Sequence, residues 1–150
     1  MNNVLEYLEN TVVYYPDKIA IEDEKGYYTF AELRKKALAF AKYIEKKLNG
    51  RRKEPILVYL PKGKECIVAF LGIVYSGNIY TPTDVRFPFR KTQEIINCLM
   101  PTLIVSDGKN SQKLRANSVC EEMIISYDDV CEYNGFVSAE IFIKKSIDID

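Results

Sequence analysis

The fold is decided by residues 56–60, which read Ile-Leu-Val-Tyr-Leu. These residues are apolar without a break, whereas a strand with one solvated face alternates apolar and polar side chains. An unbroken apolar run of this length indicates a strand that is buried on both faces of a parallel sheet. We therefore expect residues 56–60 to form a central strand.

Helices and strands alternate after this strand. The sequence predicts an almost wholly apolar helix from about Glu65 to Ser76, buried nearly all round. A short strand over residues 78–81, a helix over 88–99 and a buried strand over 102–105 follow. This order implies right-handed crossovers and a parallel sheet with helices on its faces. The expected fold class is α/β, a three-layer parallel-sheet β-α-β subdomain.

A helix and a β-hairpin are expected in front of the sheet. Asn3 can cap the first helix, which must end before Pro16. Its apolar stripe is formed by Val4, Leu5, Leu8 and Val12. Residues 18–23 and the strand that starts at residue 27 form the hairpin, with a turn at residues 24–26.

A second long helix follows the hairpin. Thr29 and Glu32 have the spacing of a capping box, in which each side chain binds a backbone N–H group of the other residue. Apolar residues then recur at helical spacing until Asn49 and Gly50, which predict a left-handed stop. The pattern is weaker after residue 107. Residues 108–118 read as a loop or a weak helix, 123–125 as a strand and 128–133 as a short helical turn.

Composition excludes several classes of partner. The chain has 150 residues, enough for one domain, and its 21 basic residues balance its 21 acidic ones. A neutral chain has no long-range field that would attract nucleic acid, so we expect no nucleic-acid partner. The longest apolar run, residues 66–75, is about half the length of a membrane-spanning helix, and no signal peptide precedes it. We expect no membrane partner and a cytoplasmic location.

Cysteine and histidine content limits the chemistry further. The four cysteines show no C-x-x-C spacing, which favours a reduced compartment and argues against structural zinc. The chain contains no histidine, the usual general base near neutral pH and the commonest metal ligand. Ser-His and Cys-His nucleophile systems are thereby excluded. We assign no catalytic, cofactor-binding or metal-binding residue within the chain.

One short motif resembles a phosphate-binding loop. Gly63 and Lys64 lie between a strand and a helix, where a Walker loop has its Gly-Lys pair. The full pattern is absent, because Glu65 replaces the required Ser or Thr and Val58 replaces the first glycine. The seven glycines are scattered, and we interpret the basic run at residues 51–53 as solvated surface.

Two aspartates directly follow predicted strands. Asp84 and Asp107 would lie at the carboxyl edge of the sheet, where open α/β sheets bind ligands. An aspartate in this position also caps the following turn or helix, and we favour that interpretation for each. If either bound a ligand, the chain would be a free-standing flavodoxin-like or phosphoacceptor module. A phosphoacceptor needs a further acidic pair after its first strand, and Asp23 with Glu24 lies instead in the predicted hairpin.

Three stretches together resemble the N-terminal part of adenylate-forming enzymes, in particular amino-acid adenylation domains and D-alanine carrier-protein ligases. Residues 15–21 and 28–33 are similar to the family's "P-x-x-A-(V/I)" strand and "(S/T)-Y-x-E-L" helix start. Residues 71–84 resemble its "L-x-x-x-K-A-G-x-x-Y-x-P-x-D" core, although Tyr75 and Ser76 replace the Lys-Ala pair. Residues 102–107 resemble the strand that ends the next unit, and Arg90-Lys91 stands where the family has Glu-Arg.

The resemblance implies the following function. Residues 1–150 would form the N-terminal α/β subdomain of an adenylation domain and end before the loop that binds the ATP phosphates, with Ser146–Asp150 just ahead of that loop. The complete enzyme would use ATP and Mg²⁺ to make an aminoacyl-adenylate and transfer it to the phosphopantetheine thiol of a carrier protein. The subdomain alone would be inactive and would contact the remainder of its domain. The presence of Asp84 after Pro82 resembles the pattern of the amino-acid-activating branch of the family. The alternative is a fragment of an acyl-CoA synthetase.

Overall fold

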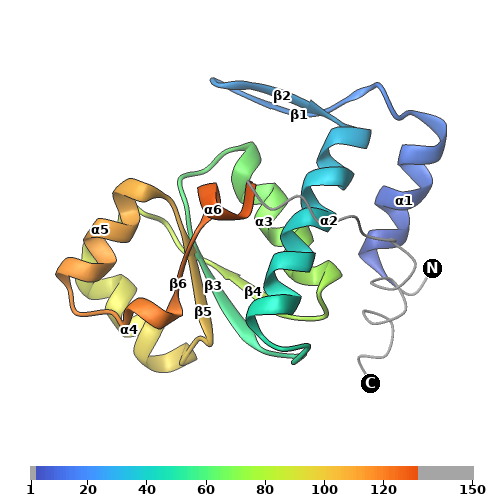
Figure 1. Cartoon of the computed structure of the whole chain (residues 1–150). Helices are drawn as coiled ribbons and strands as arrows, with labels where there is room; N and C mark the ends of the chain where they lie inside the picture. The colour runs from blue at the N-terminus through green and yellow to red at the C-terminus, as the bar shows by residue number, and fades with distance from the viewer. Residues whose placement is uncertain (1–2, 132–150) are drawn as a thin grey trace.

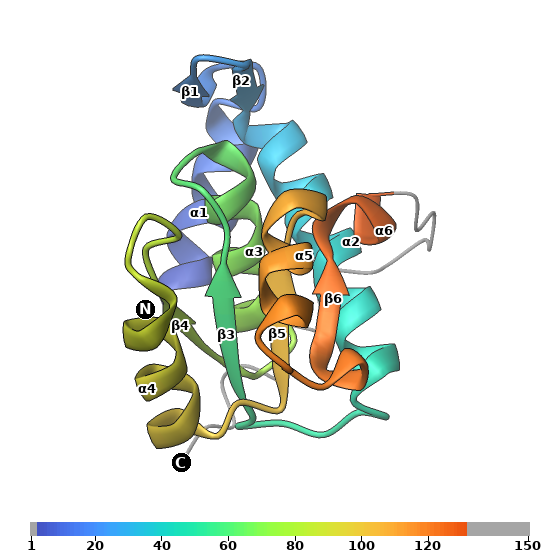
Figure 2. The same cartoon turned by 90° about the vertical axis from the view of Figure 1, so that its left-hand side faces the viewer.

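A four-stranded parallel sheet forms the centre of the computed structural model, which describes residues 3–131 (Figure 1). The strand order is β4-β3-β5-β6, so the 56–60 run lies in a central strand, as predicted. Figure 2 shows β3 between β4 and β5. The strands are β3 (Pro55–Tyr59), β4 (Ile79–Pro82), β5 (Leu103–Ser106) and β6 (Ile124–Ser126).

Helices cover both faces of the sheet, which confirms the three-layer architecture. Ile56 and Val58 of β3 face the larger core cluster, whose helical members come mainly from α2 and α3. Leu57 and Tyr59 face the other way and pack with α4 and α5. The helices concerned are α2 (Phe30–Lys47), α3 (Lys64–Tyr75), α4 (Phe89–Leu99) and α5 (Gly108–Ala116).

The N-terminal helix and hairpin are present as expected. They are α1 (Val4–Tyr14), β1 (Ile19–Asp23) and β2 (Gly26–Thr29). In Figure 1, α1 lies beside α2 on the side away from the sheet, and the hairpin projects beyond the start of α2. The capping box is confirmed, because Glu32 N donates to Thr29 Oγ1 at 3.2 Å and Thr29 N donates to Glu32 Oε2 at 2.8 Å.

The prediction that Val4 belongs to the buried stripe of α1 is wrong. Leu5 and Leu8 are buried, but Val4 is 62% exposed. The inner face of the helix includes Glu9 instead, because Glu9 accepts hydrogen bonds from groups on α2 and α3. A partly buried carboxylate with good partners thus lies on a face that the apolar pattern alone could not define.

Helices α2 and α3 approach each other closely, and this contact depends on Gly72. A Cβ atom at residue 72 would lie 2.6 Å from Phe40 Cβ and 3.0 Å from the backbone oxygen of Ala37. Only a hydrogen atom fits between the helices at this point. The contact joins the N-terminal elements, α1, the hairpin and α2, to α3.

α3 is less buried than the sequence suggested. Half of its residues are buried, but Phe70, Ile67 and Val74 are only partly covered within the described chain. The reason is that α3 lies beside β4, which is an edge strand. Ile79 and Tyr80 on that strand are 55% and 39% exposed. The apolar run in the sequence of α3 therefore contains core residues as well as residues of a partly covered strip that α3 forms with β4.

The weakly patterned region after residue 107 is more regular than expected. Residues 108–116 form α5, a true helix whose first turn is capped by Asp107. The expected strand is preceded by a 3₁₀ turn, η1 (Glu121–Met123), and the short helix is α6 (Tyr127–Cys131). The rest of the expected 128–133 turn and the Ser146–Asp150 segment lie outside the described residues.

We predict that Gly72→Ala destabilises the protein by about 1–3 kcal/mol, the usual cost of overpacking a core. Alanine has a higher helix propensity than glycine, by about 1 kcal/mol, but the overlap with Phe40 and with backbone outweighs this gain. Urea unfolding followed by circular dichroism measures the change. Gly108→Ala is the matched control, since nothing lies within 4 Å of the added Cβ, and its stability should not fall. A Gly72→Ala variant as stable as the wild type would contradict the close contact.

Candidate functional site

The carboxyl edge of the sheet is where ligands bind in folds of this kind. From β3 the chain passes to β4 on one side, and β5 then lies on the other side of β3. The loops after these strands therefore diverge and leave space between them. Two hollows lie at this edge, and both are lined by Leu60 and Lys62 from the loop after β3.

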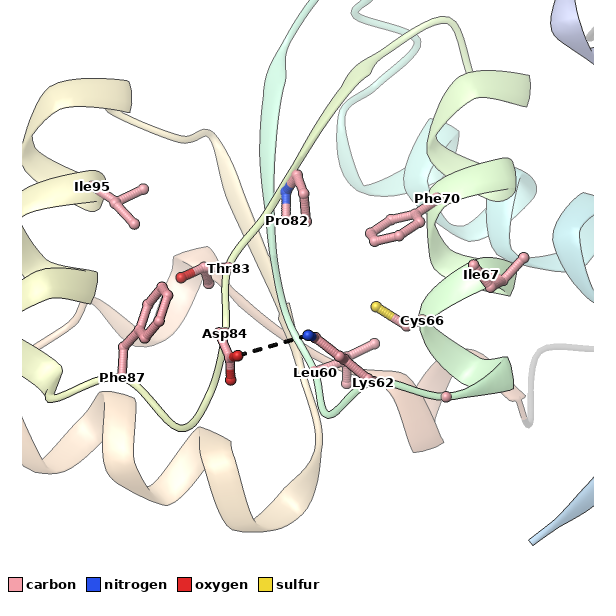
Figure 3. A pocket seen from close by; sticks show the side chains of 11 residues that line it. Leu60, Lys62, Cys66, Ile67, Phe70, Pro82, Thr83, Asp84, Phe87 and Ile95 are labelled. Atoms are coloured by element: carbon pink, nitrogen blue, oxygen red, sulfur yellow. Dashed lines mark ion pairs between the residues drawn. The ribbon is translucent and has the colours of Figure 1, made fainter. Parts of the chain in front are cut away.

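The first, which we call the apolar hollow, wraps around the end of β4 (Figure 3). It has a volume of about 480 Å³. Most of its lining is hydrophobic and comes from α3, from α4 and from the loops after β3 and β4. The apolar side chains include Leu60, Cys66, Ile67, Phe70, Phe87 and Ile95.

Asp84 lines the apolar hollow but is occupied by its own turn. Arg86 donates to its carboxylate from the backbone N–H group at 2.9 Å, from Nε at 3.0 Å and from NH2 at 2.7 Å. These bonds hold the pKa of Asp84 well below its usual range. Lys62 Nζ approaches the same carboxylate at 4.0 Å. The turn-capping interpretation is confirmed for Asp84.

The second, which we call the polar hollow, has a volume of about 280 Å³ and lies between the hairpin and the ends of β3, β5 and β6. Asp107 lines it and caps α5, because Asn110 donates to its carboxylate from N at 2.7 Å and from Nδ2 at 2.9 Å. The capping interpretation is thus confirmed for Asp107 as well. Among residues 3–131, no group of three or more potential ligands is arranged to hold a metal ion.

The loop that resembles a phosphate site already holds an anion of the protein's own. Lys64 N donates to Asp23 Oδ2 at 2.9 Å, and Lys64 Nζ donates to Asp23 Oδ1 at 3.0 Å. The Asp23 carboxylate therefore lies at the N-terminus of α3, where a phosphate would lie in a Walker loop. These two bonds, the backbone bond first, lower the pKa of Asp23 to about 2.

Gly63 makes this arrangement possible. A Cβ at residue 63 would lie 2.9 Å from Asp23 Oδ2. The side chain of Lys64 is nearly buried, with its ammonium group 5.4 Å from the centre of the Tyr28 ring. The Gly-Lys pair thus serves to fasten the hairpin to α3. Sequence reasoning missed this role, because 41 residues separate the partners and no local pattern connects them.

Sequence reasoning also missed a second, partly buried polar cluster. Tyr75 on α3 donates from its hydroxyl to Glu9 Oε1 at 2.5 Å, and Arg34 Nε donates to both oxygens of Glu9 at 2.8 and 2.9 Å. Burial, together with the bond to Glu9, strongly raises the pKa of Tyr75. The cluster ties α1 to α2 and α3. Tyr75 is the residue that replaces lysine in the resemblance described above.

The basic run lies at the opposite end of the sheet. Arg51 and Lys53 are exposed, and Arg51 NH1 pairs with Glu54 Oε1 at 3.4 Å, as expected for surface residues. Arg52 differs, because it is half-buried and packs over Gly77. Its Nε and NH2 atoms have no hydrogen-bond partner in the described part of the chain.

Within residues 3–131, no helix is both long enough and apolar enough to cross a membrane.

Comparison with known proteins gives a consistent result. The sequence profile of the AMP-binding enzyme family matches residues 8–144. A nonribosomal peptide synthetase of Aspergillus rugulosus is 28% identical over 132 residues, which are 88% of this chain and 2% of that protein. A D-alanine–D-alanyl carrier protein ligase of Listeria monocytogenes is 29% identical over 103 residues, 69% of this chain and 20% of the ligase. The chain therefore spans only a small part of these relatives.

Solved structures share the fold. VinN in complex with 3-methylaspartate superposes with a TM-score of 0.76 at 21% identity and covers 97% of this chain and 38% of its own. A benzoate CoA ligase from Burkholderia xenovorans gives a TM-score of 0.74 at 20% identity and covers 87% of this chain and 28% of its own. At these identities the likeness concerns the architecture.

We predict that Asp23→Asn lowers the midpoint of thermal unfolding at pH 7 and that the loss fades as the pH falls from about 4 to about 2. The pKa of Asp23 is depressed in the folded state, to about 2 from an unfolded value near 3.8. Its ionised form therefore stabilises the fold above pH 4, and this contribution disappears as the folded group is protonated. Melting curves of both proteins across this range measure the difference.

Asp17→Asn is the control, because Asp17 is exposed and should leave the melting midpoint unchanged at every pH. Lys64→Met tests the partner. If the Asp23–Lys64 bond carries the effect, the double variant should be less destabilised than the sum of the single variants. Additive losses would argue against a direct interaction.

Proposed function

Because the chain belongs to the AMP-binding enzyme family, we propose that it forms the N-terminal α/β subdomain of an ATP-dependent, amino-acid-activating ligase. In the reaction of such a ligase, the substrate carboxylate attacks the α-phosphate of ATP, and an aminoacyl-adenylate and pyrophosphate result. A carrier-protein thiol then takes the aminoacyl group and releases AMP. The observation that carries the proposal is the family match over residues 8–144.

The lengths of the relatives support the subdomain role. The chain covers 20% of the D-alanine–D-alanyl carrier protein ligase and 38% of the VinN chain. In this proposal, residues 1–150 supply one layer of the enzyme, and the rest of the adenylation domain completes the active site. The partly covered strip on α3 and β4 is consistent with contact to that remainder.

The three places that resembled a site for phosphate or a cation, the N-terminus of α3 and the two aspartates after β4 and β5, are already taken by groups of the protein itself. A phosphate cradle needs free backbone N–H groups at a helix N-terminus, but Asp23 already occupies the N-terminus of α3. The carboxylates of Asp84 and Asp107 are each bonded to groups of their own loops. What these residues do is structural: they set the hairpin, the turn after β4 and the start of α5. ATP and Mg²⁺ would bind to groups outside residues 3–131.

The amino-acid branch is favoured over the acyl-CoA branch. Asp84 follows Pro82 as in the amino-acid-activating pattern, and the sequence relatives include a carrier-protein ligase. Benzoate CoA ligase shares the fold, which keeps the acyl-CoA synthetase as the alternative within the family. In the proposed pathway the partner is a phosphopantetheine-bearing carrier protein.

The strand order supports a second candidate from another class. β4-β3-β5-β6 is the order that begins flavodoxin-like sheets, which bind their ligands at the carboxyl edge. A free-standing binding module would use the hollows at that edge. A phosphoacceptor role is not favoured, because the Asp84 and Asp107 carboxylates are capping groups that line different hollows.

We predict no amino-acid-dependent ATP–pyrophosphate exchange by residues 1–150 alone, because residues 3–131 form neither a metal-ligand cluster nor a free phosphate loop that could neutralise charge at the α-phosphate. The product of the whole reading frame should catalyse exchange with one or a few amino acids. Radioactive pyrophosphate incorporation into ATP measures both. A second assay compares thioester formation on a carrier protein with that on coenzyme A and so separates the two branches. Exchange by residues 1–150 alone would overturn the proposal.

A further inference from the structure

Residues 46–53, at the end of α2 and in the turn that follows it, carry five basic side chains: Lys46, Lys47, Arg51, Arg52 and Lys53. We propose that this segment, which we call the basic turn, docks an acidic segment of a partner protein. β3 begins shortly after the basic turn, which therefore lies at the amino edge of the sheet (Figure 2). The two hollows lie at the carboxyl edge, so the proposal does not depend on adenylate formation.

The zero net charge of the chain conceals a strong asymmetry. Residues 34–53 contain 9 of the 21 basic residues but only 1 of the 21 acidic ones, Glu45. The remaining 12 basic and 20 acidic residues lie elsewhere in the chain. At a distance the two signs cancel, but within a Debye length, about 10 Å at 0.1 M salt, the positive segment acts alone. An acidic group that comes this close is attracted.

Helix dipoles account for only part of this charge. α2 ends at the basic turn, and α3 ends beside it, because Lys53 N donates to Gly77 O at 2.9 Å. The C-terminus of a helix carries about half a negative charge, so the two helices together offset about one of the five cations. Glu45 and Glu54 offset two more. Within residues 3–131, positive charge is therefore left over for a partner.

The basic turn is ordered by its own backbone. Gly50 N donates to Glu45 O at 2.9 Å, and Arg51 N donates to Leu48 O at 3.1 Å. The side chain of Leu48, only 1% exposed, anchors the turn in the core. A surface that is already ordered loses less conformational entropy on binding than a flexible basic tail would lose.

Lys53 occupies a backbone conformation that lysine rarely adopts. Its φ is 60°, in the left-handed region, where glycine, asparagine and aspartate are the favoured residues. The residue is exposed, and its side chain forms no ion pair with the part of the chain that the structure describes. No contact of the side chain within the described residues offsets the strain, and the ammonium group is accessible to a partner.

The surroundings of the basic turn favour a short acidic peptide segment over nucleic acid or lipid. Bases stack on exposed aromatic side chains, and none is present in residues 42–54. A membrane-binding helix needs a whole apolar face beside its basic residues, whereas the turn is flanked by isolated apolar side chains such as Ile79. A long polyanion would also meet the acidic remainder of the chain. A few carboxylates reach the cations without this repulsion.

Fluorescence anisotropy with a labelled peptide of eight glutamates tests the proposal. The wild-type chain should bind this peptide saturably in 0.1 M NaCl. Binding should be tighter in 0.01 M NaCl, because the Debye length increases from about 10 Å to about 30 Å. A peptide of eight glutamines with the same label should not bind, since it lacks the carboxylates.

Two double variants of equal net charge test the position of the site. Lys47→Glu with Lys53→Glu should weaken peptide binding about ten-fold, because each change replaces an attraction by a repulsion. Lys91→Glu with Lys109→Glu, at exposed positions on α4 and α5, is the matched control. It should bind the peptide like the wild type. Circular dichroism verifies that both variants are folded.

A single variant separates binding from folding. Asparagine tolerates the left-handed backbone of residue 53 better than lysine does, so Lys53→Asn should not lower the melting midpoint. It should still weaken peptide binding, by about two- to five-fold, because one exposed charge pair is lost. Unchanged peptide affinity would remove Lys53 from the proposed site.

The proposal is overturned if the wild type shows no saturable peptide binding in 0.1 M NaCl or if the two double variants bind equally. A short DNA duplex and vesicles that contain phosphatidylserine are titrated in the same buffer. Tighter binding of either would assign the basic turn to nucleic acid or to a membrane and overturn the proposal. Salt-sensitive self-association in sedimentation equilibrium would instead assign it to a second copy of the chain. The adenylation assay is separate, so its outcome does not affect this test.

Discussion

The contact between α2 and α3 at Gly72 is the constraint on which the rest of the structure depends. It allows two helices to approach so closely that Phe40 lies against the backbone of the other helix. α2 follows α1 and the hairpin, and α3 connects β3 to β4, so this contact fixes the N-terminal elements on the sheet. The hydrogen bonds from Lys64 to Asp23 and from Tyr75 to Glu9 can form only when the helices are held in this way. Polar partners that are far apart in sequence thus depend on an apolar contact.

Sequence patterns predicted those elements whose determinants are local. The Thr29–Glu32 capping box spans three residues, and the apolar run at 56–60 indicates burial by itself. For α5 the sequence predicted only a loop or a weak helix, because the stability of this helix comes from a cap and one buried leucine rather than from an apolar stripe. The exposure of Val4 could not be predicted, since it depends on which neighbours α1 meets. Local rules therefore gave the elements and their order, but not the side-chain partners between them.

The same distinction applies to the candidate site. The capping roles of Asp84 and Asp107 were predictable because their partners, Arg86 and Asn110, lie two and three residues away. The apolar hollow is built from several elements, and no single segment of sequence contains its pattern. The Gly63–Lys64 pair shows how a short motif can mislead, since its geometry is right but its anion comes from the hairpin.

The distance along the chain between Asp23 and Lys64 also has a consequence in time. The hairpin is translated 41 residues before its partner lysine, and α3 must leave the ribosome before either bond can form. Until then, the buried faces of α1 and α2, including Leu5 and Phe40, lack the helix that covers them. The first third of the nascent chain therefore cannot bury its apolar faces until the second third has been synthesised. A pause in synthesis between them would leave this apolar surface open to chaperones.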